Sequence, residues 1–76
     1  MNVRPNPLSP NAWLVHLFNS QAACEGSVIR RKIRDVEKYV DRTTFLQEMR
    51  RRGYPVVENA GQFVIFFNQE PIRRVA

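Results

Sequence analysis

The sequence predicts an α+β fold, in which two to three N-terminal helices pack on a C-terminal antiparallel β-hairpin or three-stranded meander. Ser9 and Pro10 form a favourable helix start, apolar residues recur at helical spacing between positions 29 and 40, and the pattern changes to that of strands after residue 54. A chain of 76 residues has room for one small domain. We assign residues 1–8, which contain two Pro and two Asn, to a disordered tail and residues 9–76 to that domain.

The first predicted helix follows Ser9, which can act as its N-cap with Pro10 in the first helical position. Residues 12–23 place apolar side chains on one side. The run 13–18 is apolar nearly all round, however, so a short buried strand is also possible. We favour the helix and expect it to stop at Gly26.

A second helix is predicted from Ser27, a possible N-cap, because the next apolar residues fall at i, i+4, i+7 and i+11. These residues are Ile29, Ile33, Val36 and Val40. After a break at residues 41–43, the segment 44–47 matches a capping box that starts a third helix. Its core side is expected to carry Phe45, Leu46 and Met49. Gly53 is placed to end this helix, with Tyr54 packing back on it.

The segment after Tyr54 predicts a β-hairpin. Residues 55–58 and 62–67 read as strands, and the three loop residues 59–61 end in Gly, which is typical of a type I turn with a glycine bulge. Residues 68–71 predict a second turn, and residues 72–75 a short third strand.

The formal net charge of +5, with ten of the twelve basic residues being Arg, makes DNA or RNA a candidate partner. On a helical wheel of the second predicted helix, four cations share the face opposite the apolar stripe. They are Arg30, Arg31, Arg34 and Lys38, and we predict that they contact phosphates. The alternative is a solvated face in which Arg31 pairs with Asp35, Arg34 with Glu37, and Lys38 with Asp41.

The last predicted strand of the hairpin is apolar on both faces. Its candidate interface residues are Phe63, Val64, Ile65, Phe66 and Phe67. A chain this short has little material to cover two faces, so we expect a homodimer or a protein partner to bury one of them.

Several functions are excluded or disfavoured. One His and one Cys cannot form a four-ligand zinc site, and no glycine-rich phosphate loop or acidic metal cluster is present, so we expect no metal, no cofactor and no catalysis. The N-terminus lacks the apolar segment of a signal peptide, and the longest apolar run is too short to span a bilayer. A lone Cys fits a reducing compartment, which points to the cytoplasm.

The stretch from Phe45 to Tyr54, followed by residues 56–66, resembles HicA-type toxins, which are small basic ribonucleases with a fold like that of double-stranded-RNA-binding domains. The shared pattern is a helix, Gly-aromatic, a strand, a glycine turn and an apolar strand. In that family the turn glycine is followed by a small residue and the catalytic His, whereas Gly61 is followed by Gln62 and Phe63, and the family's closing helix is absent. The resemblance therefore implies an RNA-facing fold without the nuclease chemistry.

Three functional hypotheses follow. The first is a non-catalytic nucleic-acid-binding or regulatory domain. The second is a protein-interaction module or homodimer that uses the apolar hairpin. The third is a ribonuclease-like toxin, for which His16 is the only available histidine.

Overall fold

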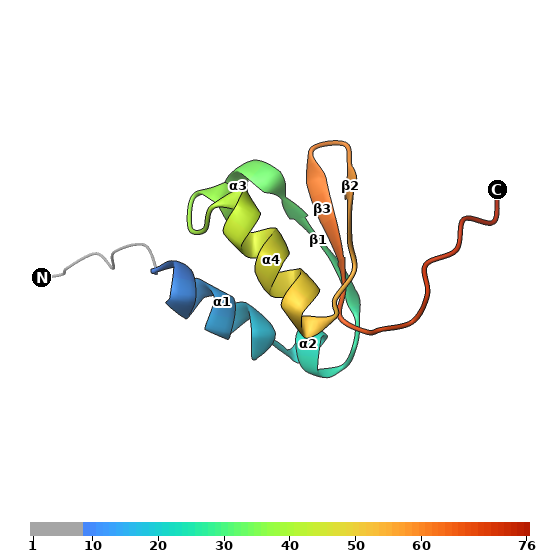
Figure 1. Ribbon diagram of the computed structural model, residues 1–76, viewed down its shortest axis with the longest axis horizontal. Helices are drawn as coiled ribbons and strands as arrows, with labels where there is room; N and C mark the ends of the chain where they lie inside the picture. Colours follow the sequence, from blue (N-terminus) through green and yellow to red (C-terminus); the bar gives the residue numbers. More distant parts are fainter. Residues whose placement is uncertain (1–8) are drawn as a thin grey trace, which may run out of the picture.

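Four helices and three strands follow one another along residues 9–76, which are the residues that the computed structural model describes. In chain order they are α1 (Pro10–Phe18), α2 (Gln21–Cys24), β1 (Val28–Lys32), α3 (Ile33–Glu37), α4 (Arg42–Arg52), β2 (Val56–Asn59) and β3 (Gln62–Phe66). The strands form one antiparallel sheet in the order β1-β3-β2, with the helices on one side of it (Figure 1). The predicted α+β fold is confirmed, while the predicted tail, residues 1–8, lies outside the described residues.

The segment 12–24 is helical, as favoured from the sequence, but it is divided into α1 and α2. Ser9 caps α1 by accepting a hydrogen bond from the backbone N–H of Ala12 at 3.1 Å, with Pro10 in the first turn. Ser20 caps α2 in the same way through the N–H of Ala23 at 3.2 Å. Each Ser contributes about 1 kcal/mol by satisfying an amide that the helix itself cannot satisfy.

The predicted second helix is wrong over residues 28–32, which form the edge strand β1. The apolar residues whose spacing suggested a helix do contact the core. Ile29 packs against it from the strand, and Ile33 and Val36 belong to it from α3. Ile29 lies opposite Ile65 of β3, so a long-range pairing holds this segment extended. Tertiary context has overridden a local pattern that was compatible with both structures.

Helix α4 begins at Arg42 and not at the predicted capping box. Asp41 is the N-cap, and its carboxylate accepts the N–H of Thr44 at 3.2 Å, so Thr44 lies inside the first turn. The predicted end is confirmed. Gly53 adopts a left-handed conformation with φ 77°, and the N–H of Tyr54 donates to the carbonyl of Met49 at 2.9 Å, which closes the helix.

The hairpin is confirmed, but its turn is shorter than predicted. Asn59 and Gln62 are paired, which leaves Ala60 and Gly61 as a two-residue loop. Both have positive φ, 53° and 72°, as in a type I′ turn. The predicted strand over residues 72–75 is absent, because residues 67–76 have no regular structure and β1 supplies the third strand.

Ala60→Asn is expected to raise the free energy of unfolding by about 0.5–1 kcal/mol, because Asn tolerates a positive φ better than Ala and Asn-Gly is the preferred type I′ pair. In a domain of this size the midpoint of thermal unfolding should rise by several degrees, which circular dichroism can measure. Ala60→Val is the control and should lower the midpoint, since a β-branched side chain is strained at positive φ. A lower midpoint for both variants would contradict the assigned turn.

One hydrophobic core lies between the helices and the sheet. Phe45 of α4 is fully buried, and its ring stacks on that of Phe63 with centroids 5.0 Å apart. Trp13 of α1 packs on Phe45, with ring centroids 6.2 Å apart, and stacks on Tyr39, with ring centroids 5.8 Å apart. These aromatic contacts hold α1 and α4 on the inner face of β3.

Candidate functional site

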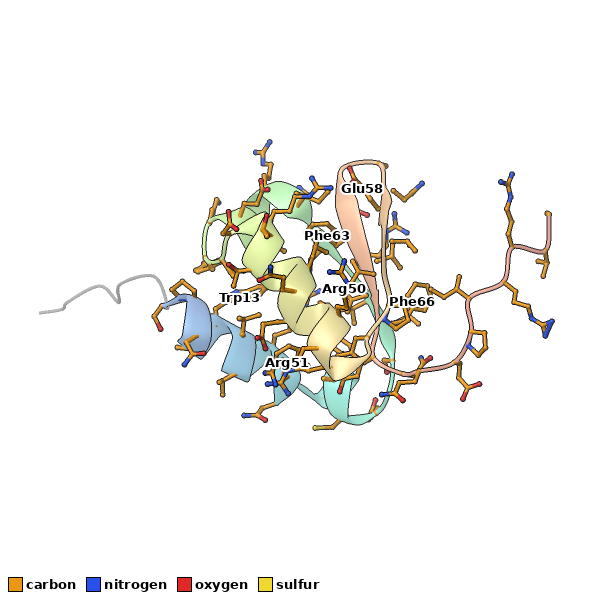
Figure 2. The ribbon with its side chains drawn as sticks, viewed as in Figure 1. Trp13, Arg50, Arg51, Glu58, Phe63 and Phe66 are labelled. Atoms are coloured by element: carbon orange, nitrogen blue, oxygen red, sulfur yellow. The ribbon has the colours of Figure 1, made fainter. Side chains whose placement is uncertain are left out.

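The sheet has one covered face and one open face. Phe63, Ile65 and Phe67 are at most 3% exposed and belong to the core beneath the helices. Because side chains alternate along a strand, Val64 and Phe66 lie on the opposite face, and Figure 2 shows Phe66 on the side away from Phe63. Three of the five predicted interface residues are therefore unavailable to a partner, which corrects the prediction for Phe63, Ile65 and Phe67.

The open face combines positive charge, amides and apolar side chains. The strand registers assign to it Val28, Arg30, Lys32, Val57, Asn59, Gln62, Val64 and Phe66. None of these side chains is acidic, and no helix among residues 9–76 covers them (Figure 1). Residues 68–76 lead away from the body on this side and carry Arg73 and Arg74. The open face is thus the cationic side of the sheet.

Arg30 is held across all three strands. Its Nε donates to Oε1 of Gln62 on β3, and its Nη2 donates to Oδ1 of Asn59 on β2 at 2.8 Å. Two of the five N–H donors of the guanidinium are used in this way, which leaves three for a ligand. The two amides neutralise no charge, so Arg30 remains a full cation in a fixed position.

The other half of the open face is apolar. Val64 is only 9% exposed, yet it does not belong to the core cluster beneath the helices. On the open face it lies between Arg30 of β1 and Val57 of β2. Phe66 is partly exposed, and Val28 opposite it on β1 is 50% exposed. Phe66 lies on one side of Val64 along β3, whereas the guanidinium of Arg30 is directed to the other side, toward Gln62 and Asn59. The aromatic ring and the fixed guanidinium therefore lie toward opposite ends of the same open face, with Val64 between them.

The four predicted phosphate-binding cations do not form one face. Arg30 is on the open face, whereas Arg34 and Lys38 lie on and just after α3, which packs on the helix side. Arg31 alternates with Arg30 on β1, and its Nη1 donates to the carbonyl of Arg30 at 2.9 Å. The grouping was wrong because it assumed a helix through residues 28–32.

The ion pairs also differ from the predicted alternative. Lys38 lies 3.6 Å from the carboxylate of Asp35, and not beside Asp41, which caps α4. Neither of the other two predicted pairs, Arg31 with Asp35 and Arg34 with Glu37, occurs within residues 9–76.

Three residues of the open face, Lys32, Asn59 and Gln62, were not predicted as site residues from the sequence. They carry a recognisable signal only if residues 28–32 are taken as a strand, because alternate positions 28, 30 and 32 then face the same side as 62, 64 and 66. The β-branched pair Val28 and Ile29 after Gly26 is the local hint of that strand.

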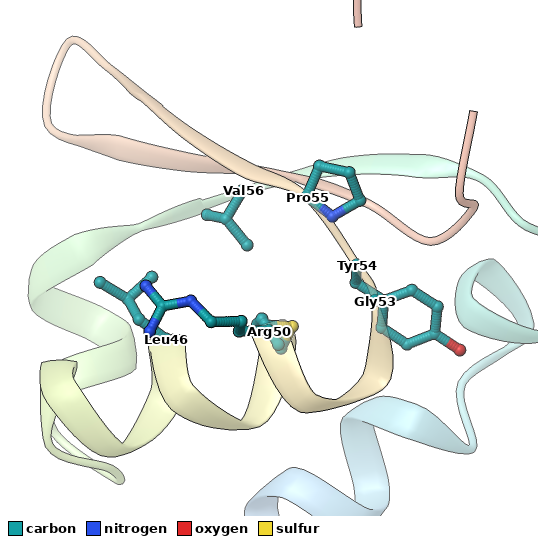
Figure 3. A pocket seen from close by; sticks show the side chains of 7 residues that line it. Leu46, Arg50, Gly53, Tyr54, Pro55 and Val56 are labelled. Atoms are coloured by element: carbon teal, nitrogen blue, oxygen red, sulfur yellow. The ribbon is translucent and has the colours of Figure 1, made fainter. Parts of the chain in front are cut away.

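The three consecutive arginines at the end of α4, Arg50, Arg51 and Arg52, do not share the same contacts. Arg51 and Arg52 both approach the carboxylate of Glu48, at 2.8 and 3.7 Å, and the hydrogen bond from Arg51 lowers the pKa of Glu48. Arg52 also lies over the ring of Phe18, 3.8 Å from its centroid. Arg50 has no carboxylate partner within the described residues, and it lines a groove between α4 and the start of β2, where its side chain extends toward Leu46 (Figure 3).

Comparisons with known proteins identify no relative of this chain. No family model matches the chain, and neither a curated protein nor a solved structure shows a significant similarity to it. The resemblance to HicA-type toxins stays a prediction. Within residues 9–76, no helix has the length and apolar character to cross a membrane, and no three His, Cys, Asp or Glu side chains come together as metal ligands.

Proposed function

We propose that this protein binds single-stranded nucleic acid on the open face of its sheet and acts as a non-catalytic binding domain. The observation that carries the proposal is Arg30, held by Gln62 and Asn59 across three strands, on the same face as a partly exposed Phe66 and without acidic side chains on that face. Guanidinium groups bind phosphate through paired N–H donors, and aromatic rings on a sheet stack on unpaired bases.

Each part of the open face has a distinct role in this proposal. Arg30 and Lys32 neutralise phosphates along β1, while the ring of Phe66 stacks on a base. The amides of Asn59 and Gln62 fix Arg30 and keep their own N–H groups for base edges or sugars. Single strands are favoured over duplexes, because a duplex hides the faces of the bases that Phe66 contacts.

Fluorescence anisotropy with labelled single-stranded and duplex oligonucleotides of DNA and RNA tests the proposal. Affinity for single strands should exceed that for duplexes and should fall steeply between about 50 and 200 mM salt, because phosphate contacts release counterions. Absence of binding at the lower salt concentration would contradict a nucleic-acid function.

Arg30→Glu is expected to weaken single-strand binding by about tenfold or more, since a charge-assisted contact contributes about 1.5–3 kcal/mol. The matched control is Arg34→Glu, which changes the net charge equally but lies on α3. Phe66→Leu should also weaken binding, by about fivefold to tenfold, because stacking contributes about 1–3 kcal/mol per base. Equal losses for Arg30→Glu and Arg34→Glu would show that only overall charge matters and that the open face is not the site.

A second candidate function is supported by the apolar half of the open face, where Val28 is 50% and Val57 is 39% exposed. A protein partner that covers this half would form a complex that survives high salt. Val64→Lys or Phe66→Lys should dissociate such a complex. A folded monomer without any salt-resistant complex would count against this function.

A further inference from the structure

The two edges of the sheet have unpaired backbone groups. The N–H of Phe66 donates to the carbonyl of Pro55 at 2.9 Å, which shows that the pairs 55:66, 57:64 and 59:62 are the hydrogen-bonded ones. Val56 and Glu58, which lie between these pairs, therefore direct their N–H and C=O groups away from the sheet. They form an outward-facing edge on β2 that is able to pair with another strand.

The edge of β1 is protected against such pairing, whereas that of β2 is not. Arg30, Arg31 and Lys32 are consecutive on β1, and Arg31 donates to the carbonyl of Arg30, which is one of the outward-facing groups. Charged side chains of one sign on an edge repel a second copy. The residues of β2 are Val56, Val57, Glu58 and Asn59, without any cation.

A groove of about 430 Å³ borders the free edge of β2. Val56 and Pro55 line it on one side, and Leu46 and Arg50 of α4 on the other, as Figure 3 shows. Arg50 is its only charged lining residue and has no carboxylate partner among residues 9–76, unlike Arg51 and Arg52. The groove is suited to apolar side chains accompanied by one carboxylate.

We propose that two copies of this protein pair through antiparallel β2 strands, centred on Val57. In that register Val56 of each copy exchanges hydrogen bonds with Glu58 of the other, which satisfies the outward-facing backbone groups of both strands. Glu58 already lies on the helix side of the sheet, where it receives a hydrogen bond from Arg42 at 2.7 Å. Glu58 of the second copy is therefore placed opposite Val56, beside the groove, and supplies the carboxylate that Arg50 lacks.

This pairing places the open faces of the two copies side by side, on the same side of one continuous sheet. Val57 lies on the open face and is 39% exposed, so the two Val57 side chains become direct neighbours. In this single register, β2 of the second copy provides backbone groups that pair with the free edge, the side chain of Val57 and the carboxylate of Glu58. The strands are short, so we expect a weak dimer that depends on concentration. This inference does not depend on nucleic-acid binding.

Sedimentation equilibrium of the intact protein between about 10 µM and 1 mM tests the pairing. The wild-type protein should move from monomer to dimer over this range, and Val57→Lys should raise the dimer Kd on the order of tenfold or more, because two like charges are placed opposite each other. Val28→Lys is the matched control: it is also a valine on the open face, but on the protected edge of β1. Its dimer should be unchanged.

A second pair of variants tests the groove. Arg50→Glu should raise the dimer Kd, because it places a carboxylate beside that of Glu58 from the other copy. Arg73→Glu changes the net charge equally in the segment that follows the sheet and should have no effect. Circular dichroism of each variant verifies the fold. A monomer at every concentration overturns the proposal, as does a dimer that Val57→Lys leaves intact. Equal weakening by Val28→Lys also overturns it, since the open faces and not the β2 edges would then meet.

Discussion

Phe45→Ala is expected to lower the free energy of unfolding by about 3–5 kcal/mol, which is the largest effect of any substitution considered for this protein. Phe45 is 0% exposed, stacks on Phe63 of β3 and packs on Trp13 of α1, so its loss opens a cavity between three elements at once. A domain of this length has a total stability of about 4–11 kcal/mol. The variant should therefore be largely unfolded at mild urea concentrations, as followed by far-ultraviolet circular dichroism.

Phe66→Ala is the matched control for this prediction. It removes the same ring from the open face of the sheet, where the side chain is partly exposed and no helix packs on it. The change in free energy of unfolding should be clearly smaller, because less apolar area returns to water and no closed cavity is created. If Phe66→Ala destabilised the protein as strongly as Phe45→Ala, the assignment of the open face would be wrong.

Gly26→Ala is expected to lower the free energy of unfolding by about 1–3 kcal/mol. Gly26 has φ 72°, and an added Cβ would lie 3.3 Å from the carbonyl oxygen of Phe67, a backbone atom that cannot rotate away. The position is also constrained on both sides: the N–H of Ser27 closes α2 on Ala22 at 2.9 Å, and Asn68 donates to the carbonyl of Gly26 at 3.0 Å. Strain here is transmitted to the start of β1.

Gly61→Ala separates the two causes of the destabilisation expected for Gly26→Ala, which are the left-handed backbone and the contact with Phe67. Gly61 has the same φ of 72°, but an added Cβ would meet nothing within 4 Å. Its destabilisation therefore measures the cost of the left-handed backbone alone, and the urea midpoint of Gly26→Ala should lie below that of Gly61→Ala. Equal midpoints would show that the contact with Phe67 relaxes without cost.

Local signals in the sequence were sufficient for many boundaries of the fold. The Ser9-Pro10 start, the left-handed glycines at positions 26 and 53, and the hairpin between residues 56 and 66 were all predicted. Each depends on the backbone preferences of a few neighbouring residues, such as the N–H that Pro lacks or the Cβ that Gly lacks. Such preferences act within one turn of chain and can be recognised without the rest of the molecule.

The candidate site could not be predicted in the same way. Asn59, Gln62 and Arg30 are brought together only because β1 crosses to the far side of β3, and a helix was predicted for β1. The unbroken apolar run of residues 63–67 indicated that the last strand of the hairpin was apolar on both faces, but it did not tell which face the helices cover.

By itself, the sequence determined the fold class, the hairpin, the start of α1 after Ser9, the end of α4 at Gly53 and the excess of positive charge on this protein. The tertiary structure decided that residues 28–32 are a strand, which side chains remain on the open face, and that Arg50 rather than Arg51 or Arg52 faces the groove. The physical reason is that apolar residues such as Ile29 gain the same burial from a strand as from a helix. Only pairing with β3, far along the chain, selects between the two.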